Sequence, residues 1–523
     1  MTRNRSQADD MLGVERIGLF AYIMETAAYS LLVSIAPVLA SVAFYVLGDG
    51  RAMYRDMLLD YGSTFYAPEE YRNITTRNPG SEANLYFQDG VDLSHAGNEA
   101  MTDSSALGAW MYQTWFLMHG FLGVLVFQPS RAGVAATALL TMLLYIPAGQ
   151  LQVVLQARFV KLGSSTTSDD TAKSAGLIIV LLQLFGIPLI KLTSWAFTDR
   201  KGGALKLYGL LLLDNVIAAI VTSAYTWFML AKFTAGDASL VELLLLRTVL
   251  HTAFISLTTS FHGWLHHHLV EDFGVALHRA SLVYVVWATF FTYYGRALQT
   301  AAESVPQAIA FEVFATGAEI FMLDTFLKGN TPLFDLRMLL TCRKPTNTKR
   351  DQNRTFFCSD IIIMLAVAEA AALVASTAEV VTARTNFGAE PGTPRKSFTL
   401  TGANFAIMLF GELVVTDGVV GWLAKTFKKR YVIDPAMEWQ RMKTRSTGFL
   451  AATALVMSIS FCQILPFVKN SGCITAHAGA EEDWSRTSCP PVPEDITDML
   501  RVGDSYREEW LAAGGVGGNS LDE

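Results

Sequence analysis

Charged residues are scarce in this sequence of 523 residues. Asp, Glu, Lys and Arg make up 17% of the chain, whereas soluble domains contain about 25%. Hydrophobic residues make up 51%, and the net charge is -7. No basic domain stands out, so a nucleic-acid partner is not expected. The composition indicates many membrane spans rather than a single anchor.

Several motifs of common chemistry are absent as well. The P-loop pattern G-x-x-x-x-G-K-[ST] does not occur, and neither does G-x-S-x-G or H-E-x-x-H. The five cysteines contain no C-x-x-C pair, so a structural zinc site is not expected. These absences favour a function other than enzyme catalysis, and the sequence specifies no cofactor.

Long apolar runs predict an all-α fold, a polytopic transmembrane helix bundle with about 11 spans. A span needs about 20 predominantly apolar residues. The first run is too long for a signal peptide, whose apolar region covers about 7–15 residues, and we interpret it as a retained signal-anchor helix. The expected spans are 17–46, 106–127, 132–160, 174–197, 205–232, 239–265, 275–298, 305–328, 358–383, 402–424 and 448–468.

The basic residues predict the orientation of the bundle. With eleven spans, the basic loops 329–357 and 425–447 and the turn 197–206 all fall on the N-terminal side of the membrane. Because basic loops are enriched on the cytosolic side, we expect the N-terminus there. The chain then divides into a cytosolic N-terminus (1–16), a transmembrane bundle (17–468) and an extracytosolic acidic tail (469–523).

Two segments are expected on the extracytosolic side. The loop 48–105 has too little apolar material to bury a core of its own, so we expect it to cap the outer ends of the helices. It holds the sequon Asn73-Ile74-Thr75, a predicted glycosylation site. In the tail, Cys473 and Cys489 are candidates for a disulfide, and the unbonded state stays open. The loop and the tail are also the expected contact surfaces for membrane-protein partners.

Four acids lie near the middle of separate apolar runs: Asp214, Glu319, Glu369 and Glu412. A carboxylate in hydrocarbon is costly, so it normally faces a partner, a cavity or an ion path. Secondary transporters place their ion and proton sites near the midplane, which favours a cation or proton site here. The alternative is that these acids are protonated or hydrogen-bonded and hold helices together.

Neighbouring residues extend this candidate site. Glu312 lies seven residues before Glu319 and shares its helix face. Arg247 is a candidate counter-ion for one acid, or a ligand for a substrate carboxylate. A second acid follows five residues after Glu319 and after Glu412, which hints at a parallel repeat of the kind that transporters use. The candidate ion- or substrate-binding residues are Asp214, Arg247, Glu312, Glu319, Glu369, Glu412 and Asp417.

Histidines form a second constellation, since seven of the nine lie within 119–278. His262 and His266 are four residues apart, a spacing that lets two histidines share a metal on one helix face. The run 262–268 partly resembles one histidine box of the membrane di-iron desaturases, a family that uses about three such boxes, whereas this sequence holds one. The alternative is a cytosolic helix end, where His is favoured by the helix dipole.

Together these patterns rank three functions for an integral, multi-pass membrane protein whose partner is the lipid bilayer. The first is a secondary transporter or permeation pathway for a cation, or for a solute coupled to a cation or proton. The second is a non-catalytic receptor or an assembly subunit of a larger membrane complex. The third is a membrane oxidoreductase with a histidine-ligated metal or haem.

Overall fold

A computed structural model describes most of the expected bundle. The described residues are 17–42, 113–160, 177–199, 203–224, 240–300, 304–334, 349–386, 398–427 and 430–462. Within these ranges the secondary structure is helical and contains no strand. Asn73, Cys473 and Cys489, together with the loop 48–105 and the tail 469–523, lie outside the described residues.

Six of the described helices are long and apolar enough to cross a membrane. A seventh candidate arises if two helices separated by a 103° bend, Pro435–Thr444 and Thr447–Cys462, form one broken span. The protein is therefore a multi-span helical membrane protein, and about eleven spans are more than this criterion finds. The six are Leu19–Ala40, Arg131–Leu151, Leu177–Ala196, Ala204–Thr222, Lys349–Ala378 and Gly402–Thr426.

The distribution of side chains agrees with a lipid environment. Large apolar side chains point outward, for example Phe20 (76% exposed), Leu205 (85%) and Phe321 (73%). Charged side chains such as Arg296 and Asp360 are buried instead. Soluble monomers rarely expose large contiguous apolar patches, so the outer surface fits hydrocarbon better than water.

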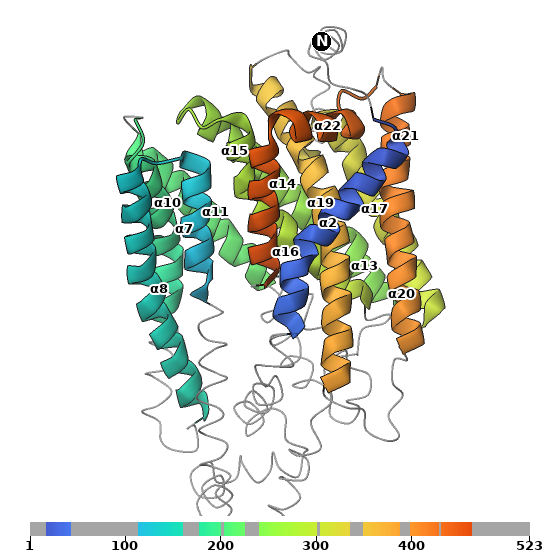
Figure 1. The fold of residues 1–523 in the computed structure, drawn as a ribbon, viewed down its shortest axis with the longest axis horizontal. Coiled ribbons are helices and arrows are strands. Elements are labelled where there is room, and N and C mark those ends of the chain that lie inside the picture. The colour runs from blue at the N-terminus through green and yellow to red at the C-terminus, as the bar shows by residue number, and fades with distance from the viewer. Residues whose placement is uncertain are drawn as a thin grey trace, which may run out of the picture.

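Helix α19 (Lys349–Asn386) forms the centre of the bundle (Figure 1). Its apolar stretch is 83% buried, against at most 44% in the other five candidate spans. Helices α2 (Leu19–Val42) and α16 (Val285–Thr300) pack against it. The middle of α19 is rich in alanine, which favours helix formation and lets neighbouring backbones approach closely.

Two helices that carry candidate acids run parallel to each other. Helix α17 (Val305–Leu327) starts at the N-cap Ser304, whose hydroxyl accepts a hydrogen bond from the amide of Gln307. The other is a continuous helical path made of three segments, α20 (Phe398–Phe410), the π-helical turn η7 (Gly411–Thr416) and α21 (Asp417–Thr426). The amides of Val432 and Ile433, just after α21, donate to the carbonyl oxygen of Leu327 at 2.9 and 3.1 Å. The carboxyl ends of the two paths therefore meet.

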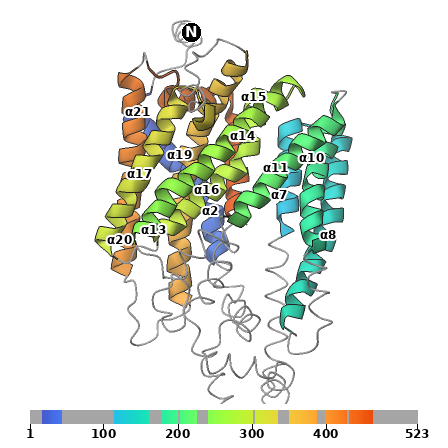
Figure 2. The ribbon, with the colours of Figure 1, turned by 180° about the vertical axis from the view of Figure 1, so that it is seen from behind.

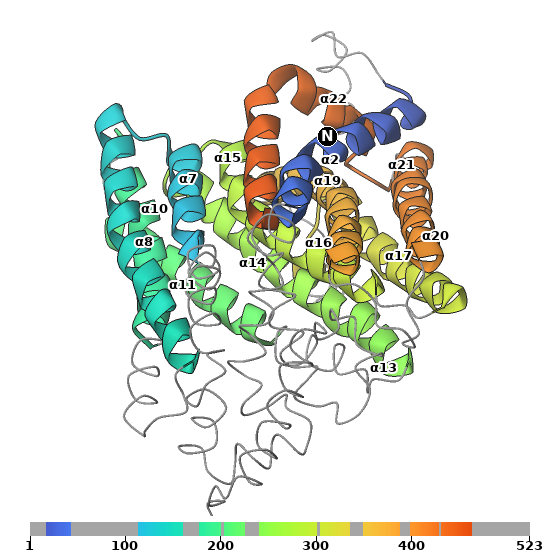
Figure 3. The same ribbon diagram turned by 60° about the horizontal axis from the view of Figure 1, so that its bottom comes forward.

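Four helices gather at one side of the molecule, as Figures 1, 2 and 3 all show. We call them the four-helix group: α7 (Trp115–Phe127), α8 (Arg131–Val160), α10 (Ile187–Ala196) and α11 (Ala204–Ala224). The remaining described helices form the main bundle, which includes α14 (His251–Glu271), α15 (Leu277–Ser281) and α22 (Pro435–Arg445). An ion pair of 2.7 Å between Lys206 and Asp272 links the two parts.

Two further π-helical turns occur in the described chain besides η7. They are η3 (Leu182–Gly186) and η5 (Leu246–Leu250), which follows α13 (Leu240–Leu245). Such turns are rare and often mark functional sites in helices. Here η5 carries Arg247 and η7 carries Glu412, two of the candidate site residues.

Candidate functional site

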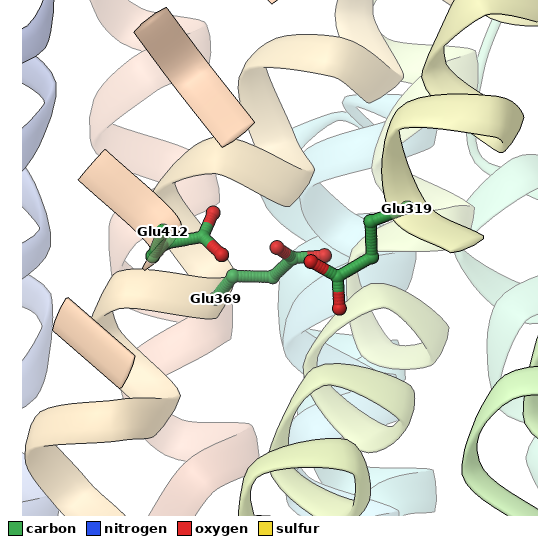
Figure 4. Close-up of side chains that lie close together, drawn as sticks. All are labelled: Glu319, Glu369 and Glu412. Carbon is green, nitrogen blue, oxygen red and sulfur yellow. The ribbon is translucent and has the colours of Figure 1, made fainter. Parts of the chain in front are cut away.

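The guanidinium of Arg296, on α16, is the centre of the site. Its Nη1 lies 3.6 Å from Oε2 of Glu312, and its Nη2 lies 3.8 Å from Oε2 of Glu319 and 3.4 Å from Oε2 of Glu369. Nη2 also donates a hydrogen bond to Glu412. These acids come from α17, α19 and η7, and three of them appear in Figure 4. We call these five residues, together with Arg247, the Arg296 cluster.

Arg247 brings a second guanidinium to the cluster. It is buried on η5 and donates a hydrogen bond to Glu319, so Glu319 lies between two arginines. Gly295 lies close to this arginine, because a Cβ there would make tight contacts of 3.2 Å with Cζ of Arg247 and 3.1 Å with Nε2 of His251. The Nε atom of Arg247 has no hydrogen-bond partner among the described residues.

Glu312 lies directly against the backbone of η7. Its Oε1 accepts a hydrogen bond of 3.1 Å from the hydroxyl of Thr316, one turn further along α17. A Cβ on Gly411 would overlap the Glu312 carboxylate. The glycine before Glu412 therefore lets the two acid-bearing paths approach each other.

Carboxyl groups outnumber guanidinium groups here. Asp417, also buried, interacts electrostatically with Glu369 and Arg296, and its Oδ2 has no hydrogen-bond partner in the described part of the chain. Among the described residues, this makes five carboxyl groups with the four glutamates against two arginines, an excess of three negative charges if all are ionised. Uncompensated buried charge is very costly. Bound protons or cations would reduce such an excess.

Three of the glutamates also have the geometry of a cation site. Glu319, Glu369 and Glu412 each place a carboxylate oxygen within 4.8 Å of the others. Carboxylate oxygens are ligands that hard cations prefer. Nη2 of Arg296 lies within ion-pair distance of all three. A cation bound by this trio would therefore replace that nitrogen.

Asp214 lies apart from the Arg296 cluster. It is on α11 in the four-helix group, where its Oδ2 is 3.6 Å from Nζ of Lys191 and its Oδ1 is 3.0 Å from Nε2 of His262. All three side chains are buried. The structure thus brings Arg247, Asp417 and the four glutamates together, and places Asp214 in a second ionic site.

His262 and His266 have different partners. Nε2 of His262 faces Asp214, and its Nδ1 lies 2.8 Å from the carbonyl oxygen of Thr258. Nε2 of His266 lies 3.0 Å from the carbonyl oxygen of Leu277. In this arrangement the two histidines do not converge on a common point as a shared metal would require.

Two further acids, Glu25 and Asp324, lie nearer the ends of their helices and belong to other contacts. Glu25 accepts hydrogen bonds from Nε1 of Trp439 at 2.8 Å and Nζ of Lys443 at 2.7 Å. Asp324 accepts from Lys328 and from the hydroxyl of Tyr431 at 2.6 Å. Both have basic partners outside the Arg296 cluster, so neither adds to its negative charge.

Arg296 is the residue that reasoning from the sequence overlooked. It lies two positions before the end of the expected span 275–298, where a basic residue resembles a helix end that reaches toward water. In the structure, α16 continues to Thr300 and Arg296 is only 1% exposed. A count of every basic residue inside the spans, matched against the buried acids, would have identified it.

The carboxyl groups of the Arg296 cluster can bind protons or cations, which would compete with the guanidinium for the same carboxylate oxygens. The cluster is built from carboxyl and guanidinium groups on five different helical segments of the main bundle. Comparison with known proteins adds no relative to this picture: no family model matches the chain, and no curated protein or solved structure is significantly similar to it.

Proposed function

We propose that this protein is a secondary transporter or permeation pathway for a cation, or for a solute whose movement is coupled to a cation or proton. One observation carries the proposal: the buried Arg296 guanidinium faces four carboxyl groups in a cluster where acids exceed arginines. Buried ionisable residues in a membrane protein generally mark an ion or proton pathway. Transporters commonly place such a site at the midplane between helices.

In the proposed cycle Arg296 acts as an internal counter-ion. An incoming cation or proton neutralises one or two carboxylates, and the guanidinium keeps a partner because other acids remain within reach. Glu312 contacts Nη1, whereas the other three glutamates contact Nη2. The π-helical turns that carry Arg247 and Glu412 are the segments of irregular backbone at which the site would rearrange.

We also propose the topology expected from the sequence, with about eleven crossings and a cytosolic N-terminus. Support comes from contacts at one end of the bundle. Lys206, at the start of α11, pairs with Asp272 after α14, and Lys349, at the start of α19, pairs with Glu271 at 2.6 Å. These contacts bring two of the basic segments to the same end, as the excess of basic residues in cytosolic loops requires.

The proposal is tested by flux measurements on purified protein in liposomes. A pH gradient or a membrane potential is imposed, and proton flux is followed with a trapped pH-sensitive dye in the presence of different inorganic cations. Glu319→Gln and Glu412→Gln each remove one carboxylate with little change in shape, and we expect each to abolish coupled flux. Glu25→Gln makes the same chemical change outside the cluster, where the acid binds Trp439 and Lys443, and should retain flux.

The same experiment separates transport from a receptor or assembly role. If the cluster only holds helices together, the wild-type protein gives no flux above empty liposomes, and the two substitutions alter only thermal stability. Equal flux from the wild type and from both cluster variants would also refute the proposal.

A further inference from the structure

The second ionic site connects the two parts of the molecule. Asp214 belongs to α11 of the four-helix group, and His262 belongs to α14 of the main bundle. Oδ1 of Asp214 lies 3.0 Å from Nε2 of His262, and Oδ2 lies 3.6 Å from Nζ of Lys191 on α10. None of the three residues contacts the Arg296 cluster through a described ion pair. The site can therefore be considered separately from the proposed transport function.

The contacts of His262 imply a proton. Nδ1 lies 2.8 Å from the carbonyl oxygen of Thr258, and a carbonyl only accepts hydrogen bonds, so Nδ1 carries a hydrogen. In a neutral ring Nε2 would then be an acceptor. It would face an ionised carboxylate oxygen, a second acceptor, at 3.0 Å. Two lone pairs repel at this distance, and neither atom has a hydrogen-bond partner among the described residues, so a proton on Nε2 or on Asp214 is what makes the contact favourable.

Aromatic rings enclose the imidazole of His262. The rings of Phe261, Tyr284 and Trp287 lie 5.3, 5.3 and 5.6 Å from the imidazole, measured between ring centroids. They belong to α14, to the 3-10 turn η6 (Leu282–Tyr284) and to α16. His262 is only 2% exposed. Aromatic rings favour a nearby cation, and they separate the imidazole from water.

Other titratable groups face the pair from neighbouring helices. Lys191 approaches from α10 on the far side of Asp214. His119, half-buried on α7, interacts electrostatically with both Lys191 and Asp214. The Tyr284 hydroxyl lies 2.9 Å from Oγ1 of Thr259, and His266 lies one turn further along α14. Lys191 opposes an added positive charge on His262, whereas Asp214 offsets it.

We propose that Asp214 and His262 form a proton-binding site at the junction of the four-helix group and the main bundle. A proton on either group makes the contact attractive and so holds α11 against α14. Loss of that proton leaves two acceptors opposed and turns an attraction between the two helix groups into a repulsion. Proton occupancy is thereby linked to how the groups pack, whatever the Arg296 cluster transports.

The protonation state is measured directly, on the full-length protein in lipid nanodiscs with ring-15N histidine. The resonances of His262 are assigned as those lost in His262→Asn. We expect an imidazolium with both nitrogens protonated at neutral pH, or else a protonated carboxyl stretch in the infrared spectrum that is lost in Asp214→Asn. His266→Asn is the matched control, because His266 contacts a backbone carbonyl instead of an acid.

Two variants must act in opposite directions. Asp214→Asn replaces the carboxylate that faces Nε2 of His262 and should weaken the packing of α11 against α14, whereas Lys191→Met removes the competing partner of Asp214 and should strengthen the contact with His262. The proposal is overturned if the wild-type spectra show a neutral His262 beside an ionised Asp214. That result is read from the wild-type protein, with the variants used only to assign its signals, and it leaves the flux assay of the Arg296 cluster unaffected.

Discussion

Nη2 of Arg296 lies 3.4 Å from Oε2 of Glu369, in the interface between α16 and the central helix α19. Both side chains are buried, and the same nitrogen donates to Glu412. One guanidinium thus connects the middle of the bundle to the π-helical turn η7.

Removal of the guanidinium should destabilise the protein strongly. Arg296→Met leaves four glutamates without the partner that they share, and breaking a buried pair from one side costs about 3–5 kcal/mol. Arg296→Lys retains the charge but loses the planar fork, so we expect an intermediate loss. Thermal unfolding in detergent measures both. The double variant Arg296→Met with Glu412→Gln should lose less than the sum of the two single losses, because it removes both partners. Additive losses would contradict the pairing.

The close approach at Gly411 gives a second prediction. Gly411→Ala places a methyl group where the Glu312 carboxylate lies, so it should lower the melting temperature and the flux. The matched control is Gly402→Ala on α20, where a Cβ meets no atom within 4 Å. That change should be neutral or stabilising by up to about 1 kcal/mol, since alanine favours helix over glycine. Equal effects at the two positions would refute the proposed contact.

The link between Lys206 and Asp272 predicts a small dependence of stability on pH. Hydrogen bonds from Lys206 and then from His268 lower the pKa of Asp272 from its ordinary value. Because the pKa is lower in the folded state, the ionised Asp272 carboxylate stabilises the fold at pH values above the unfolded-state pKa of about 3.9. This stabilisation disappears as the pH falls through the folded-state pKa. Because the pair is exposed, it contributes about 0.5 kcal/mol at low salt. Melting temperatures of the wild type and Asp272→Asn should therefore differ at neutral pH and converge in acid, and a constant difference would argue against this pair.

The proposed topology can be tested by labelling and glycosylation. Lys349 is exposed at the end of α19 that carries the basic segment, so a cysteine at this position should react with a membrane-impermeant reagent from the cytosolic side alone. In a eukaryotic host, the chain should carry a glycan that Asn73→Gln removes, which a gel shift after glycosidase treatment detects. Labelling of position 349 from the extracytosolic side would invert the topology.

Much of the architecture could be predicted from hydropathy and charge alone. The apolar runs predicted a helical membrane bundle because a helix is the form in which one segment satisfies its own backbone in lipid. The positions of Glu312 and Glu319, seven residues apart, predicted a common face, and both contact Arg296. The parallel course of the paths through Glu319 and Glu412 also agrees with the expected directions of those spans.

Other features depend on how the helices rotate and pack, which hydropathy does not encode. Asp214 matched the glutamates in estimated depth, yet it faces His262 and Lys191 in another part of the molecule. Histidines four residues apart looked able to share a metal, but different neighbours contact each ring. Arg296 looked like a helix end because the glutamates that surround it are distant in the sequence and meet it only in the folded bundle.

By itself the sequence determined that buried acids would lie on several helices within a membrane, since their cost in lipid follows from composition and position along each run. The tertiary structure decided which acids meet and which base they share. A side chain leaves its helix in a direction that the helix sets, but it gains a neighbour there only when the helices pack. That packing brings four glutamates to Arg296. It places Asp214 beside His262 and Lys191 instead.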